Sequence, residues 1–181
     1  MDLDKPQVLT YAEKGVNYTV HCARWVPSSN RFVALGERPR GTGAFQIYEL
    51  DGPEIKTAVD SEKTGAIRCG TFNASDTRQI AVGDFLGKMS IIDLESYQKP
   101  VYSCDAHNGL INCIDGCAGT RGYGPPEIVT GGKDGCVRVW DPRQKGVPVA
   151  EIEPEDDQKE NARDCWTVAF GNSHSPDGKC F

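Results

Sequence analysis

The chain has 181 residues, of which 38% are hydrophobic and 25% charged, so a chain disordered throughout is excluded. Its 20 glycines and 11 prolines are spread along the sequence, which is typical of a turn-rich β protein and excludes a collagen repeat or a long helical bundle. The formal net charge of −6, with no cluster of five or more Lys and Arg residues, argues against nucleic acid as a partner.

The first residues and the cysteines bear on where the protein works. Residues 1–10 have no basic start followed by an apolar stretch, and no run of about 18 apolar residues occurs, so neither a secretory signal nor a membrane span is predicted. We therefore expect a cytoplasmic protein whose eight cysteines are thiols that fill the core. No Cys-x-x-Cys pair occurs and only three histidines are present, so no metal and no other cofactor is expected.

Short runs in which apolar and polar residues alternate, ending at Gly, Asp, Asn or Pro, occur throughout the sequence. This period of two residues is typical of β-strands, and no helical pattern of comparable length competes with it. In chain order, the clearest predicted strands are residues 32–36, 44–50, 79–84, 88–94, 127–132 and 136–141. The sequence therefore predicts an all-β fold.

The predicted strands recur in a fixed order. A segment with apolar or small residues at offsets −5, −2 and 0 occurs four times, and its last position, the anchor, is spaced by 47, 44 and 54 residues. The anchors are Trp25, Phe72, Gly116 and Phe170. Other strands end in an apolar residue followed by an acid, as in Trp140-Asp141. A unit of about 40–45 residues with four short strands is typical of one blade of a β-propeller.

The third unit is the clearest one. It has His107 before its first strand, Thr130 on the second, Asp134 in the following turn and Trp140 on the third. A buried histidine needs a hydrogen-bond partner at each ring nitrogen, and a carboxylate in the turn orients the ring. With all four residues at this spacing, the unit resembles the WD-repeat family, and the resemblance implies that they form a hydrogen-bonded structural tetrad.

The first two units depart from this pattern. The second has Leu86 where the turn Asp belongs and Ile92 in place of Trp, and the first has Tyr48 in place of Trp. Neither has a His before its first strand. We expect these two blades to depend on packing and on the sheet ladder.

The repeat divides the chain into an N-terminal segment and a series of blades. The predicted ranges are 1–14 for the segment, 15–62, 63–106 and 107–160 for three blades, and 161–181 for the start of a fourth. The predicted fold is a WD-repeat β-propeller with about three complete four-stranded blades and the start of another. Known propellers have at least four blades, so these cannot close a ring. The resemblance implies seven blades, and we expect the N-terminal half of a longer protein rather than two copies that complete one another.

The resemblance extends beyond the repeat itself. Residues 14–20, 40–50, 66–72, 100–103, 126–145 and 163–172 are similar to those of one group of WD-repeat adaptor proteins. This implies a non-enzymatic scaffold whose partners are the RuvB-like ATPase co-chaperone complex, prefoldin-like subunits and dynein assembly factors, with no nucleic acid, membrane or small-molecule substrate. It implies a role in the cytoplasmic preassembly of axonemal dynein arms. A peptide- or ubiquitin-binding propeller with a regulatory role, such as modulating apoptosis, is the alternative.

Candidate partner-binding residues follow from the phase of the repeat. Four residues before each anchor, on the innermost strand, lie His21, Arg68, Asn112 and Trp166. Arg and Trp are enriched at binding hot spots, and we expect this phase to face the mouth of the central channel. For Trp166, packing between blades is the alternative. The polar loop 37–41 adds Arg38 and Arg40 at the rim.

No catalytic or phosphate-binding site is predicted. Cys104, Asp105 and His107 lie close in sequence, but the repeat assigns His107 to the tetrad and places Cys104 at the end of an outer strand. The glycine-rich stretches 119–124 and 130–135 contain no GxxxxGK[ST] motif and open no helix.

Two further features have structural interpretations. Three cysteines share one phase of the repeat, three residues before the anchor, which favours a packing role: Cys22, Cys69 and Cys113. An acidic run is interpreted as a solvated loop, with a patch for a basic partner as the alternative: Glu151, Glu153, Glu155, Asp156, Asp157 and Glu160.

Overall fold

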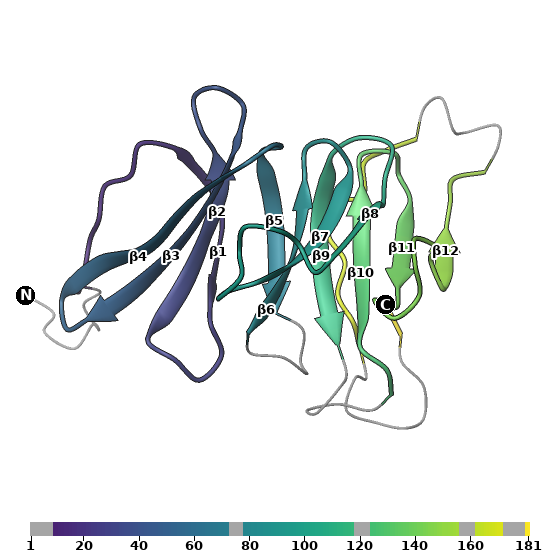
Figure 1. The fold of residues 1–181 in the computed structure, drawn as a ribbon. Helices are drawn as coiled ribbons and strands as arrows, with labels where there is room; N and C mark the ends of the chain where they lie inside the picture. The colour runs from purple at the N-terminus through teal and green to yellow at the C-terminus, as the bar shows by residue number, and fades with distance from the viewer. Residues whose placement is uncertain (1–8, 73–77, 118–123, 156–161, 172–179) are drawn as a thin grey trace, which may run out of the picture.

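The computed structural model of the chain describes residues 9–72, 78–117, 124–155, 162–171 and 180–181. Within these ranges the chain forms three four-stranded antiparallel sheets that stand side by side (Figure 1). The described part contains β-strands and no helix, and so no helix that is long and apolar enough to cross a membrane. The predicted all-β fold of four-stranded units is confirmed.

Each sheet is a meander in which strands neighbour one another in chain order. The first sheet contains β1 (Thr19–Trp25), β2 (Arg31–Glu37), β3 (Gly43–Asp51) and β4 (Glu54–Lys63). The second contains β5 (Ile67–Phe72), β6 (Gln79–Asp84), β7 (Lys88–Asp93) and β8 (Tyr102–Asp105). The third contains β9 (Ile111–Cys117), β10 (Glu127–Gly132), β11 (Val137–Trp140) and β12 (Ala150–Ile152). All six strands predicted from the alternation of residues are present, within one or two residues at each end.

The apolar core lies between neighbouring sheets rather than within one. Strands β1, β5 and β9 are the first strands of the three sheets, and β5 packs against both of the others. One cluster joins Leu35 and Phe45 of the first sheet to Ile80 of the second, and another joins Met89 of the second to Ile128 of the third. Strands β6 and β7 of the second sheet have a neighbouring sheet on each face, so most side chains of both alternating sets are buried there.

Close approach between sheets depends on glycine and on the cysteines of the shared phase. A Cβ at Gly83 would lie 2.7 Å from Cγ2 of Ile111, so only glycine leaves room for this isoleucine of the next sheet. Beside it, the Cys69 thiol donates to the Ile111 carbonyl at 3.6 Å. In the next sheet the Cys113 thiol donates to the Cys165 carbonyl at 3.8 Å. These thiols therefore lie at the packing contacts between blades.

Residues 162–171 lie beside the third sheet, where the first strand of a further blade is predicted (Figure 1, yellow). The Cys165 N–H donates to the Gly132 carbonyl at 3.0 Å, and the Phe170 N–H to an Asp115 carboxylate oxygen at 2.9 Å. Residues 162–170 form no regular strand, although the repeat anchored at Phe170 predicts the start of a further blade here. A strand needs a continuous ladder partner, and within the described residues this segment has only one isolated bridge, between Gly171 and Cys180.

The first sheet differs from the other two at the apolar positions of the repeat. Ile67 and Ile111 are 2% and 0% exposed, but Val20, which has the same phase, is 45% exposed. Ile111 packs against the preceding sheet, whereas no described sheet precedes β1. The exposure of Val20 therefore follows from the lack of a described sheet on that side of β1.

Candidate protein-interaction site

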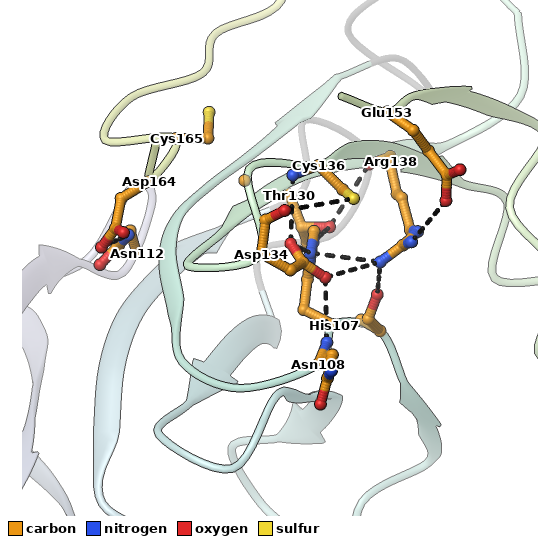
Figure 2. A network of polar contacts seen from close by, with 12 residues as sticks. His107, Asn108, Asn112, Thr130, Asp134, Cys136, Arg138, Glu153, Asp164 and Cys165 are labelled. Carbon is orange, nitrogen blue, oxygen red and sulfur yellow. Dashed lines mark hydrogen bonds and ion pairs between the residues drawn. The ribbon is translucent and has the colours of Figure 1, made fainter. Parts of the chain in front are cut away.

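The four residues of the predicted tetrad lie together in the third sheet. His107, in the turn before β9, has Nδ1 2.9 Å from Asp134 Oδ1 and Nε2 2.8 Å from Thr130 Oγ1 (Figure 2). The Trp140 indole N–H donates to Thr130 Oγ1 at 2.9 Å. The Asp134 carboxylate can only accept hydrogen bonds, and the Trp140 indole N–H can only donate one. The neutral imidazole therefore donates from Nδ1 and accepts the Thr130 hydroxyl proton at Nε2. The chain of bonds runs in one direction, from Trp140 to Asp134.

The titration of the pair is shifted by burial and by these bonds. Burial lowers the pKa of His107, and the hydrogen bond with Asp134 opposes this shift without reversing it. Burial alone would raise the pKa of Asp134, but the Asn108 backbone N–H and the His107 ring outweigh it and hold the pKa below its usual value. The neutral histidine and the ionised aspartate are therefore the favoured forms.

Arg138 extends the network and was not found from the sequence. Its Nη1 lies 3.1 Å from Asp134 Oδ2 and its Nη2 3.2 Å from Glu153 (Figure 2), and it also pairs with Glu151. The ladder places Arg138 opposite Glu151. A basic residue on one strand and an acidic run on the next was therefore the sequence feature that could have predicted this pair. These two acids are thus paired within the blade, and Asp156, Asp157 and Glu160 lie outside the described residues.

The matching positions of the second blade carry no such network. The ladders align Val82 with Thr130, Ser90 with Arg138 and Ile92 with Trp140. The turn carboxylate is nevertheless present, because Asp84 accepts the backbone N–H groups of Leu86 and Lys88 at 2.9 and 2.8 Å. The ladders match Leu86 with Asp134, as expected from the sequence, and Asp84 lies two residues earlier, at the position of Gly132.

The first blade has a polar pair of its own. The Tyr48 hydroxyl donates to the Gln46 side-chain oxygen, and both residues are buried, at the positions of Trp140 and Arg138. The expectation that this blade depends on packing and the ladder alone is therefore wrong. A phenol in place of the indole still needs a buried acceptor, and Gln46 supplies it.

The phase of His21, Arg68 and Asn112 is a β-bulge in each sheet. The register slips between Val20 and Cys22, between Ile67 and Cys69, and at the matching step of β9, so each of the three residues is left without a ladder partner. A bulge bends the strand and re-aims the extra side chain. Three polar side chains of neighbouring inner strands are thus removed from the ladder in the same way.

Contacts link this series across neighbouring blades. Arg68 Nη1 lies 3.4 Å from His21 Nδ1, and the His21 ring packs on Phe85 with centroids 5.3 Å apart. Asn112 donates to Asp164 at 3.4 Å, apart from the His107 network (Figure 2). Two buried polar atoms of the series have no hydrogen-bond partner within the described ranges: His21 Nε2 and Asn112 Oδ1.

The remaining candidates lie at or near the surface. Trp166 is 68% exposed, so the described residues do not show it packed between blades. Arg38 pairs with Asp60, whereas Arg40 is exposed in the loop that follows β2. This loop begins at Glu37, whose Oε2 lies 3.7 Å from His21 Nε2, at the same end of the blade as the bulges.

Comparisons with known proteins agree with this architecture. The model of the family "WD domain, G-beta repeat" matches residues 98–141. The structure of U3-55K superposes with a TM-score of 0.61 at 13% identity, covering 79% of this chain and 42% of that one, which supports the fold alone.

The sequence is also similar to named proteins over nearly its whole length. Dynein axonemal assembly factor 10 of Chlamydomonas reinhardtii is 48% identical, over 99% of this chain and 51% of that protein. The Homo sapiens protein of the same name is 50% identical, over 95% and 48%. Nucleoporin Nup43 of Mus musculus is 23% identical, over 84% and 37%. The chain spans about half the length of the first two relatives. The chain therefore contains one matched WD repeat, at residues 98–141, within an all-β fold of three four-stranded sheets.

Proposed function

We propose that the chain is the N-terminal half of a seven-bladed, non-enzymatic scaffold that acts in the cytoplasmic preassembly of axonemal dynein arms. The similarity to proteins named dynein axonemal assembly factor 10, at about 50% identity, supports the role in assembly. Its partners are the RuvB-like ATPase co-chaperone complex, prefoldin-like subunits and other dynein assembly factors.

The observation that carries a binding role is the repeated bulge. It presents His21, Arg68 and Asn112 from three adjacent inner strands, with buried polar atoms of two of them left without partners. Buried polar groups are normally hydrogen-bonded, so the unpaired atoms within the described residues set this phase of the repeat apart from the rest of the inner strands. Trp166, exposed at the same phase of the repeat, adds an aromatic anchor.

The described side chains offer little support for catalysis. Both ring nitrogens of His107 are occupied, and burial raises the pKa of the Cys104 thiol, so a thiolate–imidazole pair is disfavoured. Within the described ranges no three His, Cys, Asp or Glu side chains are placed to hold a metal ion.

Capture experiments with the full-length protein test this function. We expect the tagged protein to capture the RuvB-like ATPases and prefoldin-like subunits from ciliated cells, and Trp166→Ala to reduce the capture. Val147→Ala removes an exposed apolar side chain of the β11–β12 loop and is the control. If the unaltered protein captures none of these partners, the co-chaperone role is wrong. If Trp166→Ala and Arg68→Glu both capture as well as the unaltered protein, the bulged surface is not the binding site.

A further inference from the structure

Arg68 is a half-buried arginine without a carboxylate partner. The other half-buried arginines are paired: Arg38 with Asp60, and Arg138 with Asp134 and two glutamates. In the part of the chain that the structure describes, no Asp or Glu forms an ion pair with Arg68. A guanidinium partly removed from water without an anion is costly, which makes this position unusual.

The polar contact between Arg68 and His21 constrains the histidine ring. A guanidinium only donates, so His21 Nδ1 accepts the bond at 3.4 Å and the ring proton lies on Nε2. That N–H is buried and has no hydrogen-bond partner, since Glu37 Oε2 is 3.7 Å away. Arg68 retains most of its five donors, and His21 adds a further donor that is not engaged.

The equivalent residue of the next blade shows what is absent here. Asn112 has the phase of Arg68 and is bonded to the Asp164 carboxylate, which comes from the chain packed on β9. Asp164 lies six residues before its anchor, Phe170. In the chain packed on β5, the residue six positions before the anchor Gly116 is Leu110. The position that carries a carboxylate beside Asn112 is therefore held, in the chain packed on β5, by a residue whose apolar side chain accepts no hydrogen bond.

We propose that Arg68, oriented by His21, binds a carboxylate from an acidic segment of a protein partner. The proposal rests on the proposed function and specifies the chemistry of its binding surface. A guanidinium and a carboxylate match in a two-pronged geometry, which adds direction to charge. One guanidinium balances a single negative charge, and Glu37 nearby disfavours the doubly charged phosphate of a phosphorylated segment.

A crosslinking experiment tests this contact directly. In the full-length protein, Arg68→Lys keeps the positive charge and supplies a primary amine. A carbodiimide joins such an amine to a carboxylate in contact with it, forming an amide while the reagent takes up the water as a urea. With the purified RuvB-like ATPase complex and its prefoldin-like subunits, we expect an amide between position 68 and an Asp, Glu or C-terminal carboxylate of a partner, identified by mass spectrometry. No crosslink, or a crosslink only to Glu37, overturns the proposal.

A binding measurement separates this proposal from the function on which it rests. Arg68→Glu is expected to weaken binding of the same complex by about tenfold or more, because it places a negative charge opposite the carboxylate of the partner. Arg24→Glu makes the same change at an exposed residue of β1 whose side chain donates a hydrogen bond to the Ala23 carbonyl and forms no ion pair within the described residues, and it is expected to change binding less than about twofold. If the unaltered protein binds and Arg68→Glu binds equally well, the carboxylate site is wrong and the scaffold role stands. If the unaltered protein does not bind, the proposed function is wrong. If phosphatase treatment of the partners abolishes binding, the group that binds Arg68 is a phosphate rather than a carboxylate, and the proposal is wrong.

Discussion

The third and second blades have the same strand ladder but different interiors. At matched positions the third has Thr130 and Trp140 in a polar network, and the second has Val82 and Ile92. Beside the second, a groove of about 450 Å³ remains, lined by residues that include Asp84 and Ile92. The blade therefore forms without the network, and the network is a local addition to one blade rather than a requirement of the fold.

The two interiors are expected to respond differently to substitution. A fully bonded polar network contributes little net free energy, but removing one member leaves buried donors or acceptors without partners. An apolar interior loses only packing when a methyl group is removed. The third blade should thus be more sensitive than the second.

The largest effect is expected for Trp140→Ala. Trp140 is 2% exposed and bonded to Thr130, so its removal leaves a cavity and is expected to lower the free energy of unfolding by about 3–5 kcal/mol. Ile92→Val, the smaller change at the matched position, should cost about 0.5–1.5 kcal/mol. Chemical denaturation of both variants measures the difference, and equal losses would contradict the comparison.

His107→Ala is expected to cost about 1–3 kcal/mol, because Thr130 and Asp134 both lose a partner in a buried site. The neighbouring Asn108→Ala is the control, since Asn108 contributes its backbone N–H to Asp134 and its side chain is exposed. An unchanged melting temperature for His107→Ala would count against a stabilising tetrad.

A double-mutant cycle between His107 and Thr130 sharpens the comparison. Thr130→Val makes the third blade resemble the second and removes the hydroxyl that joins the ring to the indole. We expect the two single losses to exceed the loss of the double variant by about 0.5 kcal/mol or more, because they break one shared bond. Ser90→Ala, at the position of Arg138 in the second blade, should be additive with His107→Ala. Additivity in both cycles would mean that no network exists.

The smallest expected effect is on pH dependence. Because burial lowers the pKa of folded His107, the unfolded chain binds the proton first as the pH falls. Its contribution is complete above the unfolded pKa of about 6.5 and is lost as the pH falls below it, by at most about 1.4 kcal/mol per pH unit. The lowered pKa of Asp134 acts separately, below about pH 4. His107→Gln should reduce the loss of stability measured between pH 7 and pH 5, and an unaltered loss would show that another group causes it.

Sequence patterns predicted many of the strands and the tetrad of the third sheet. Strand alternation located six strands, and the spacing of His107, Thr130, Asp134 and Trp140 brought together residues that the structure shows in contact. The same patterns missed Arg138. Its role depends on cross-strand register, which a single strand does not specify.

The β-bulges of the three inner strands also could not be predicted from the sequence. The phase of the repeat identified His21, Arg68 and Asn112 as candidates. The alternation of apolar and polar residues does not indicate that each of them lacks a partner in the strand ladder. A bulge is a property of two paired strands, since its extra residue is defined only by what lies opposite.

The sequence by itself determined the period, the strands and the residue type at each phase, because these follow from local alternation and spacing. Only the tertiary structure decided which of these side chains are satisfied within the chain. Asn112 meets Asp164, and the matching Arg68 meets no carboxylate in the described residues, because each neighbour comes from the adjacent blade. Residues about 45 positions apart become partners only when the sheets pack, so the pairing of charge is a result of packing rather than of the repeat.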